Sequence, residues 1–191
     1  MKDFEEREFD HEGHHFEKCI DNEFIMDACD RAMECIRGRR SFTKILFVSL
    51  LNGSLPFEAD LKSKASWKMD IMRISYHSYA GTQSTGKFNI TVPINAERVK
   101  DRDCIIIEDI VDTGRTLQKV ISDLKAAGAK SVKVICVLDK VGKHPKLPIL
   151  FSGFNITDRF VIGYGMDYDG KFRDLKHIYA SGLEKDEELV L

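Results

Sequence analysis

The chain has 191 residues, of which 43% are apolar and 31% are charged, and its formal net charge is −2. This length indicates one domain, with or without a small appendage, and the composition is typical of a soluble globular protein. The lack of a basic excess and of any run near the roughly 20 apolar residues of a membrane span argues against nucleic acid or a membrane as a partner.

Helices and strands are expected to alternate along most of the chain. Apolar spacing and apolar runs predict a helix over 23–37, a strand over 45–51, a helix over 55–64, strands over 70–76, 88–93 and 104–109, a helix over 117–127 and a strand over 132–138. This order predicts an α/β fold with a mostly parallel, twisted sheet flanked by helices. The pattern over 141–191 is less regular.

The N-terminus and the cysteines indicate a cytoplasmic location. Residues 1–7 are charged and lack an apolar secretory core. The five cysteines form no Cys-x-x-Cys pair, and Cys104 and Cys136 lie inside apolar runs, as small core residues do. A reducing compartment is the simple interpretation.

The most informative segment is 105–117, where three isoleucines are followed by two acids, a hydroxyl-rich turn and an amphipathic helix. Such a turn directs backbone N–H groups out of the carboxyl edge of a sheet, where phosphates bind. Because Glu108 and Asp109 would repel a bare phosphate, a phosphorylated sugar bound with Mg²⁺ is the ligand that fits. The alternative is that Asp112 merely caps a helix. The segment is neither a Walker loop nor a dinucleotide fingerprint.

The segment 108–117 resembles the phosphoribosyl pyrophosphate (PRPP) motif of type I phosphoribosyltransferases. The segments 160–168 and 172–175 are similar to the C-terminal part of hypoxanthine-guanine phosphoribosyltransferases, and the resemblance extends from about residue 23 to about residue 180. It implies a single phosphoribosyltransferase domain over 1–191, with a small base-binding hood formed mainly by 1–40 and 141–191.

The resemblance also implies roles for individual residues. PRPP would be bound by Glu108, Asp109, Ile110, Val111, Asp112, Thr113, Gly114, Arg115 and Thr116. Asp112 would also act as general acid/base at N7 of the purine. The purine would be contacted by Lys140, Arg159, Phe160, Val161 and Asp167, with Lys140 at the 6-oxo group and Phe160 stacked on the ring. Pyrophosphate would be bound by Asn52, Gly53 and Arg173, and Mg²⁺ by Glu108, Asp109 and Asp167.

Each of these side chains also has a plainer interpretation. Lys140 would be solvated, Phe160 would belong to the core, Asp167 would cap a turn, and Arg173 would form a surface ion pair with Asp174. The resemblance favours the functional roles over these alternatives.

Two loops carry further candidate residues. Asn52 stands where the family often has lysine, and the resemblance predicts a cis peptide bond between Leu51 and Asn52. The polar segment 77–87 is interpreted as a lid that would exclude water, with Ser78 and Tyr79 closing over the site; Ser75 and Tyr76 are the rival match.

The three histidines near the N-terminus, His11, His14 and His15, lack the spacing and the carboxylates of a zinc protease. We interpret them as part of a solvated N-terminal segment.

The implied activity is purine salvage: transfer of the 5-phosphoribosyl group of PRPP to N9 of hypoxanthine or guanine, giving IMP or GMP and pyrophosphate. Its partners would be PRPP, a 6-oxopurine base and pyrophosphate, and the protein would be a homodimer or homotetramer. The alternatives are a PRPP-binding regulatory module, an enzyme for another base such as xanthine, and a degenerate site.

Overall fold

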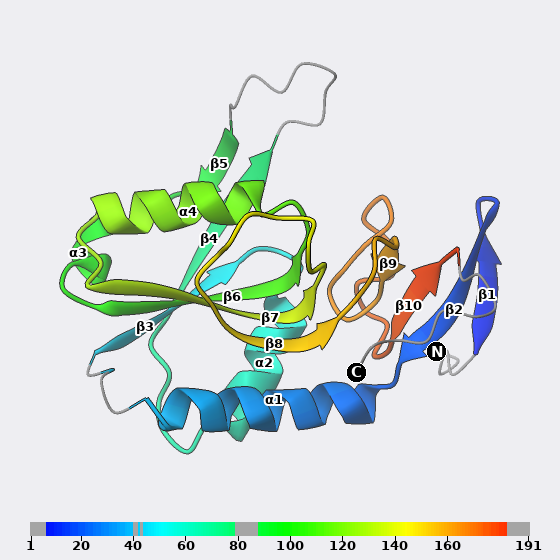
Figure 1. Ribbon diagram of the computed structural model, residues 1–191, viewed down its shortest axis with the longest axis horizontal. Coiled ribbons are helices and arrows are strands. Elements are labelled where there is room, and N and C mark those ends of the chain that lie inside the picture. Colours follow the sequence, from blue (N-terminus) through cyan, green and yellow to red (C-terminus); the bar gives the residue numbers. More distant parts are fainter. Residues whose placement is uncertain (1–6, 40–41, 43, 79–87, 183–191) are drawn as a thin grey trace.

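Two β-sheets of different size organise the chain (Figure 1). The computed structural model describes residues 7–39, 42, 44–78 and 88–182. The larger sheet has the strand order β5-β4-β3-β6-β7-β8. Its strands are β3 (Ile45–Leu50), β4 (Ile71–Ser78), β5 (Phe88–Val92), β6 (Asp103–Val111), β7 (Ser131–Asp139) and β8 (Ile149–Asn155). All neighbours pair in parallel except β5, which is antiparallel to β4. The predicted α/β class with a mostly parallel sheet is therefore confirmed.

Helices cover both faces of this sheet (Figure 1). The helices α1 (Asn22–Arg37) and α2 (Leu55–Lys64) lie on one face, and α4 (Arg115–Ala126) with the short α3 (Ala96–Val99) lies on the other. The three isoleucines of β6 alternate between the two faces, as the twofold period of a strand requires. Ile105 and Ile107 pack with α1 and α2, whereas Ile106 packs with α4, and all three are fully buried.

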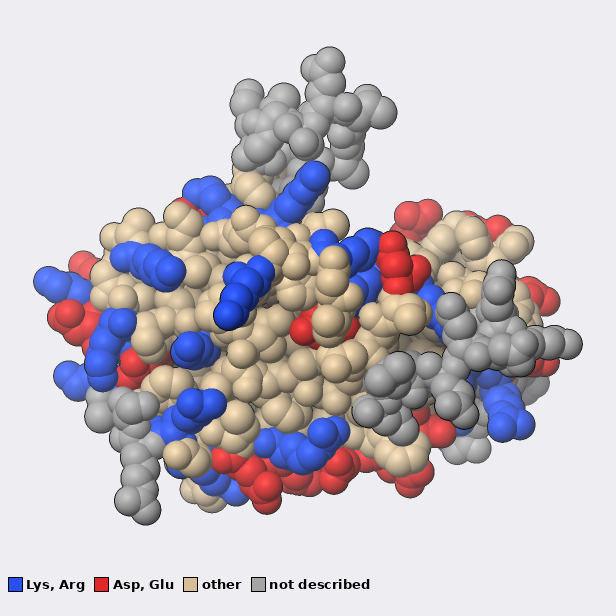
Figure 2. Space-filling view, viewed as in Figure 1, with Lys and Arg blue, Asp and Glu red and all other residues tan. Residues whose placement is uncertain are grey.

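The helix α1 illustrates how sequence spacing sets orientation. Its apolar residues at helical spacing are buried: Ile25, Ala28, Cys29, Ala32, Met33 and Ile36. The opposite face carries the exposed acids Glu23, Asp27, Asp30 and Glu34. Figure 2 shows acidic side chains in a row along the edge where α1 runs. None of the helices in the described part of the chain is long and apolar enough to cross a membrane.

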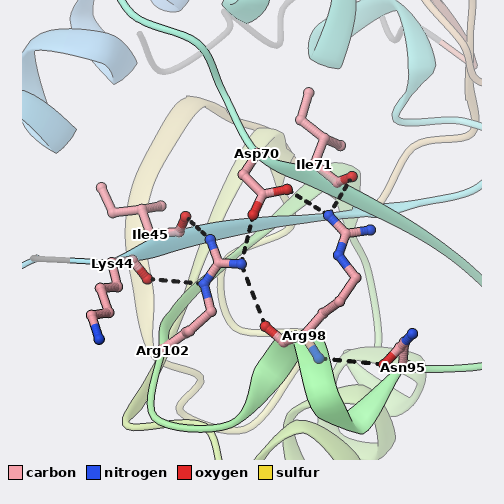
Figure 3. A network of polar contacts seen from close by, with 7 residues as sticks. All are labelled: Lys44, Ile45, Asp70, Ile71, Asn95, Arg98 and Arg102. Atoms are coloured by element: carbon pink, nitrogen blue, oxygen red, sulfur yellow. Dashed lines mark hydrogen bonds and ion pairs between the residues drawn. The ribbon is translucent and has the colours of Figure 1, made fainter.

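A polar network fixes the edge of the sheet where β3 and β4 begin (Figure 3). Asp70 accepts hydrogen bonds from Arg98 at 2.5 Å and from Arg102 at 2.6 Å. Arg102 also donates to the carbonyl of Ile45 at 2.6 Å, and Asn95 caps α3. The hydrogen bond from Arg102, reinforced by Arg98, holds the pKa of Asp70 below its usual range. The network ties α3 to the amino ends of the strands and leaves their carboxyl ends for other contacts.

The second sheet is built from the two ends of the chain. Its order is β1 (Glu8–His11), β2 (His14–Ile20), β10 (Ile178–Ser181) and β9 (Val161–Ile162). Phe16, Ile162 and Tyr179 form its buried core. The interpretation of the N-terminal segment as merely solvated is therefore wrong. The segment is a hairpin held by antiparallel pairing of β2 with β10, although His14 and His15 remain exposed.

The remaining differences between prediction and structure are small. The predicted helices and strands are observed with boundaries shifted by a few residues, but β8, β9 and β10 lie in the region 141–191 that looked irregular. These strands are short or lack a clean alternation of buried and exposed residues, so their pattern does not stand out in the sequence.

Replacement of Arg73 tests the one buried carboxylate that α2 presents to the sheet. Glu58 is 2% exposed and accepts hydrogen bonds from Arg73 at 2.9 and 2.5 Å. Burial raises the pKa of Glu58, but the bonds from Arg73 and Ser49 outweigh it, so the pKa is lowered. We expect Arg73→Met to reduce the free energy of unfolding by about 2–4 kcal/mol in urea titrations, because the buried charge loses its partner.

The matched control is Lys68→Met, since Lys68 is exposed and makes no ion pair with the described residues. Because the folded-state pKa of Glu58 is lowered, the stabilisation is present above about pH 4.3 and is lost as the pH falls below it. Equal stability of the two variants at pH 7 would contradict the assignment.

Candidate active site

Three segments meet at the carboxyl edge of the large sheet through two glycines. Gly53 follows β3, Asp109 lies near the end of β6, and Gly165 follows β9. A Cβ atom on Gly53 would overlap the carboxylate of Asp109, and a Cβ atom on Gly165 would overlap the carbonyl of Gly53. Gly165 also has φ of 96°, a backbone region that suits glycine. Only glycine at both positions allows these segments to approach so closely.

The acid pair at the end of β6 is poised to accept hydrogen bonds or a cation. Burial raises the pKa of Glu108 well above its usual value, and the neighbouring Asp109 adds to the shift. Burial also raises the pKa of Asp109, although its Oδ1 accepts a 2.8 Å hydrogen bond from the N–H of Ile110. Glu108 Oε2 is buried and has no hydrogen-bond partner among the described residues. An acceptor of this kind is suited to a ligand hydroxyl or a metal ion.

The turn after β6 presents the start of α4 to the same edge. Gly114, with φ of 69°, is the N-cap of α4, and the first turn of the helix carries no acidic residue. The alternative that Asp112 caps the helix is therefore wrong. The free N–H groups and the positive end of the helix dipole are left to attract an anion.

Lys140 is held beside this turn. Its backbone N–H donates to the carbonyl of Val111 at 2.9 Å. Its Nζ donates to Asp158 Oδ1 at 3.2 Å and lies 3.5 Å from Asp112 Oδ2. Lys140 is 7% exposed, so the alternative of a merely solvated lysine is wrong.

Four residues near Lys140 and Asp112 were not predicted from the sequence: Lys143, His144, Asp139 and Asp158. Lys143 Nζ lies 3.0 Å from Asp112 Oδ1 and also pairs with Asp158. His144 Nε2 lies 2.7 Å from Asp139 Oδ1. Burial lowers the pKa of His144, but its hydrogen bonds to Pro145 and Asp139 outweigh this effect and raise it. Spacing gave no signal for them, because the loops after β7 and β8 determine which side chains return to the site.

Phe160 lies on the side of the site nearest the small sheet. The residue is 47% exposed, and its ring meets Tyr168 edge-on, with centroids 5.8 Å apart and planes at 83°. The alternative of a core aromatic is therefore wrong, because the residue is exposed. Arg159 precedes it, and Val161 follows it as the first, buried residue of β9.

Arg173 is held by the segment that it follows. Its Nη2 lies 2.7 Å from Asp167 Oδ1, and its Nη1 donates to the carbonyl of Gly165 at 2.7 Å. The predicted alternative partner, Asp174, is wrong. Asp167 also accepts the N–H of Gly170 at 2.7 Å, so its turn-capping alternative is observed. Burial raises the pKa of Asp109 despite the opposing positive charge of Arg173.

The remaining predicted residues lie in two loops. The peptide bond between Leu51 and Asn52 is cis, as predicted. Ser78 ends β4, where it pairs with Phe88, whereas Tyr79 and the rest of the expected lid through residue 87 lie outside the described residues.

The rival lid match at Ser75 and Tyr76 is wrong. Both residues are buried within β4, and the Tyr76 hydroxyl donates to Asp123 at 3.1 Å. The strand position leaves this pair unable to close over a site.

Comparison with known proteins identifies the family. The profile of the phosphoribosyl transferase domain matches residues 19–169. The chain belongs to the phosphoribosyltransferase family. It is 32% identical over 162 residues to the hypoxanthine-guanine phosphoribosyltransferase of Mycoplasma genitalium, covering 83% of this chain and 91% of that protein. It is 38% identical over 136 residues to the enzyme of the same name in Bacillus subtilis, covering 70% and 74%.

Solved phosphoribosyltransferase structures share the fold. A hypoxanthine phosphoribosyltransferase from Staphylococcus aureus matches with a TM-score of 0.77 and 28% identity, covering 87% of this chain and 91% of that one. The chain is also 39% identical over 136 residues to the bifunctional protein TilS/HprT of Listeria monocytogenes, but it spans only 21% of that protein's length.

A pair of glycine substitutions tests the contact that joins the three segments. Gly165 and Gly170 both have positive φ, but a Cβ atom meets the Gly53 carbonyl at the first and nothing within 4 Å at the second. Alanine at either site carries about 1–2 kcal/mol of backbone strain. We expect Gly165→Ala alone to weaken PRPP binding, by about tenfold or more in calorimetric titrations with Mg²⁺, because Gly53 and Asp109 must move. Equal affinities of the two variants would refute this.

Proposed function

We propose that the protein transfers the 5-phosphoribosyl group of PRPP to N9 of hypoxanthine or guanine, giving IMP or GMP and pyrophosphate in purine salvage. One observation carries the proposal. A helix N-terminus suited to phosphate and a pair of acids lie at the same edge of the sheet as a buried lysine and an exposed aromatic residue. The first two features suit a sugar phosphate, and the last two suit a flat base with an oxo group. The relatives named hypoxanthine-guanine phosphoribosyltransferase support it.

The donor binds along the turn after β6. The carboxylates of Glu108 and Asp109 accept hydrogen bonds from the ribose hydroxyls. The 5-phosphate lies against the start of α4, where the helix dipole favours an anion. The segment that encloses the donor is Ile110, Val111, Asp112, Thr113, Gly114, Arg115 and Thr116.

The diphosphate of the donor lies between two further elements. The backbone of Asn52 and Gly53 faces it from one side, and Arg173 clamps it bidentately from the other. The pair with Asp167 and the bond to Gly165 hold the guanidinium in place before the donor arrives.

The carboxylates also fit a magnesium ion. Glu108 has an unpartnered buried oxygen, and Mg²⁺ needs only one or two protein carboxylates beside phosphate oxygens. Glu108, Asp109 and Asp167 would hold the ion. When bound, Mg²⁺ neutralises the charge that develops on the leaving diphosphate.

The base lies between Phe160 and the end of β7. Phe160 stacks on the purine ring, and the backbone groups of Arg159 and Val161 meet its edge. Lys140 donates to the 6-oxo group of the base, an acceptor that adenine lacks. Asp167 bounds the purine side of the same pocket.

Asp112 lies beside Lys140, where its carboxylate can exchange a proton with N7. As N9 forms its bond to C1 of the ribose, the bond from C1 to the diphosphate oxygen breaks. The ribose passes through an oxocarbenium-like state, which reacts readily with water. A lid at Ser78 and Tyr79 would exclude water from this state.

The remaining assignments concern organisation. Residues 1–191 form one domain in which the small sheet, drawn mainly from 1–40 and 141–191, acts as a hood over the base. The protein works in the cytoplasm, where its five free cysteines remain reduced, and it assembles as a homodimer or homotetramer.

An assay of pyrophosphate release with PRPP, Mg²⁺ and one base at a time tests the function. We expect turnover with hypoxanthine and guanine and at least about 100-fold lower kcat/KM with adenine, whose amino group offers Lys140 no acceptor. Preferential turnover of xanthine would assign another base. PRPP binding without turnover of any base would favour the regulatory module.

Replacement of Asp112 tests the proton-transfer role. We expect Asp112→Asn to lower kcat by about 10²–10⁴-fold, because an amide cannot take the N7 proton, with little change in PRPP affinity. Steady-state kinetics and calorimetry measure the two effects. Asp174→Asn is the control, since Asp174 is exposed and makes no ion pair within the described part of the chain. Unchanged kcat in the Asp112 variant would exclude this residue as the acid/base.

A further inference from the structure

Four charged side chains from three segments form a closed group beside the base position. Lys140 and Lys143 follow β7, Asp112 follows β6, and Asp158 precedes β9. Each lysine contacts both aspartates: Lys140 Nζ lies 3.2 Å from Asp158 Oδ1 and 3.5 Å from Asp112 Oδ2, and Lys143 Nζ lies 3.0 Å from Asp112 Oδ1 and also meets Asp158. The group therefore contains two cations and two anions.

A tight turn of the backbone brings Lys143 into this group. Lys143 N donates to the carbonyl of Lys140 at 3.1 Å, which closes a tight turn. Gly142 occupies the third position of that turn with φ of 88°, the conformation for which such a turn needs glycine. The turn folds the chain back, so that two lysines three residues apart converge on the same carboxylates.

The two lysines differ in how deeply their side chains are buried, and we assign them different roles. The Lys140 side chain is 8% exposed, and the Lys143 side chain is 33% exposed. Hydrogen bonds to Asp158 and then to Asp112 raise the pKa of Lys143, so it stays charged. If Lys140 were the only cation present, both aspartates would compete with the base for its ammonium donors. A second ammonium can balance the aspartates while Lys140 turns toward the base.

We propose that Lys143 is a positioning residue for base binding: it holds Asp112 and Asp158 so that Lys140 remains free to donate to the 6-oxo group of the purine. This inference rests on the proposed function and assigns a task to a side chain outside the sequence motifs. Lys143 itself does not touch the base; it acts through the two carboxylates. Its loss would weaken recognition of the oxo group more than it would slow the chemical step.

The test compares Lys143→Met, Lys143→Arg and Lys146→Met in the full-length protein. Lys146 lies in the same loop, is exposed and makes no ion pair with the described residues, so it controls for loss of a charge. We expect Lys143→Met to raise KM for hypoxanthine about tenfold while KM for PRPP and kcat change less than about threefold. Lys143→Arg, which keeps the charge, restores KM for hypoxanthine to within about threefold of wild type.

Thermal unfolding verifies that each variant is folded, and calorimetric titration of IMP measures base recognition without turnover. A Lys143→Met protein that matches Lys146→Met in KM for hypoxanthine and in IMP affinity overturns the role of Lys143. A fall in kcat with unchanged KM overturns it as well, because it would assign Lys143 to the chemical step. Failure of the proposed function has a different signature, since wild-type protein would then make no IMP.

Discussion

The site depends on one crowded contact, in which the Asp109 carboxylate lies against the backbone of Gly53 and Gly53 lies against Gly165. Strand β3, strand β6 and the segment after β9 reach this point from different parts of the chain. Because no side chain separates them, the acid pair, the cis peptide at Asn52 and the segment carrying Asp167 and Arg173 occupy one small volume. A larger residue at either glycine would separate the groups that we propose act on one diphosphate.

The two halves of the site differ in whether their charged side chains are paired. On the proposed donor side, Glu108 and Asp109 lack a direct ion pair among the described residues, and burial raises the pKa of both. The unpartnered oxygen of Glu108 leaves an acceptor for hydroxyl donors, and a bound cation would favour the ionised form of both carboxyls. On the proposed base side, Lys140 and Lys143 are balanced by Asp112 and Asp158. A neutral base requires no net charge, only donors and acceptors held in fixed directions, and a balanced group supplies them.

Local patterns explain how much of this could be predicted from the sequence. The strand of three isoleucines, the turn at Gly114 and the helix α4 are encoded by adjacent residues, so their order and position were predicted. The resemblance implied a small hood from the two ends of the chain, but its strand pairing was not predicted, because Ile20 in β2 pairs with Ile178 near the other end of the chain. No local period reveals a partner so distant. Lys143 and Asp158 were not predicted for the same reason, since their proximity depends on turns between strands.

The small sheet also brings the N-terminal hairpin into contact with the residues next to Arg173. Phe9 and His11 contact the ring of Phe172, with centroids 5.5 and 4.8 Å away, and Lys171 pairs with Glu12 at the hairpin turn. Phe172 precedes Arg173 and has φ of 71°, a strained conformation for a bulky residue that surrounding contacts must hold. The hairpin supplies those contacts. The orientation of the Arg173 guanidinium, which we propose binds the donor, therefore rests partly on the packing of residues from the opposite end of the chain.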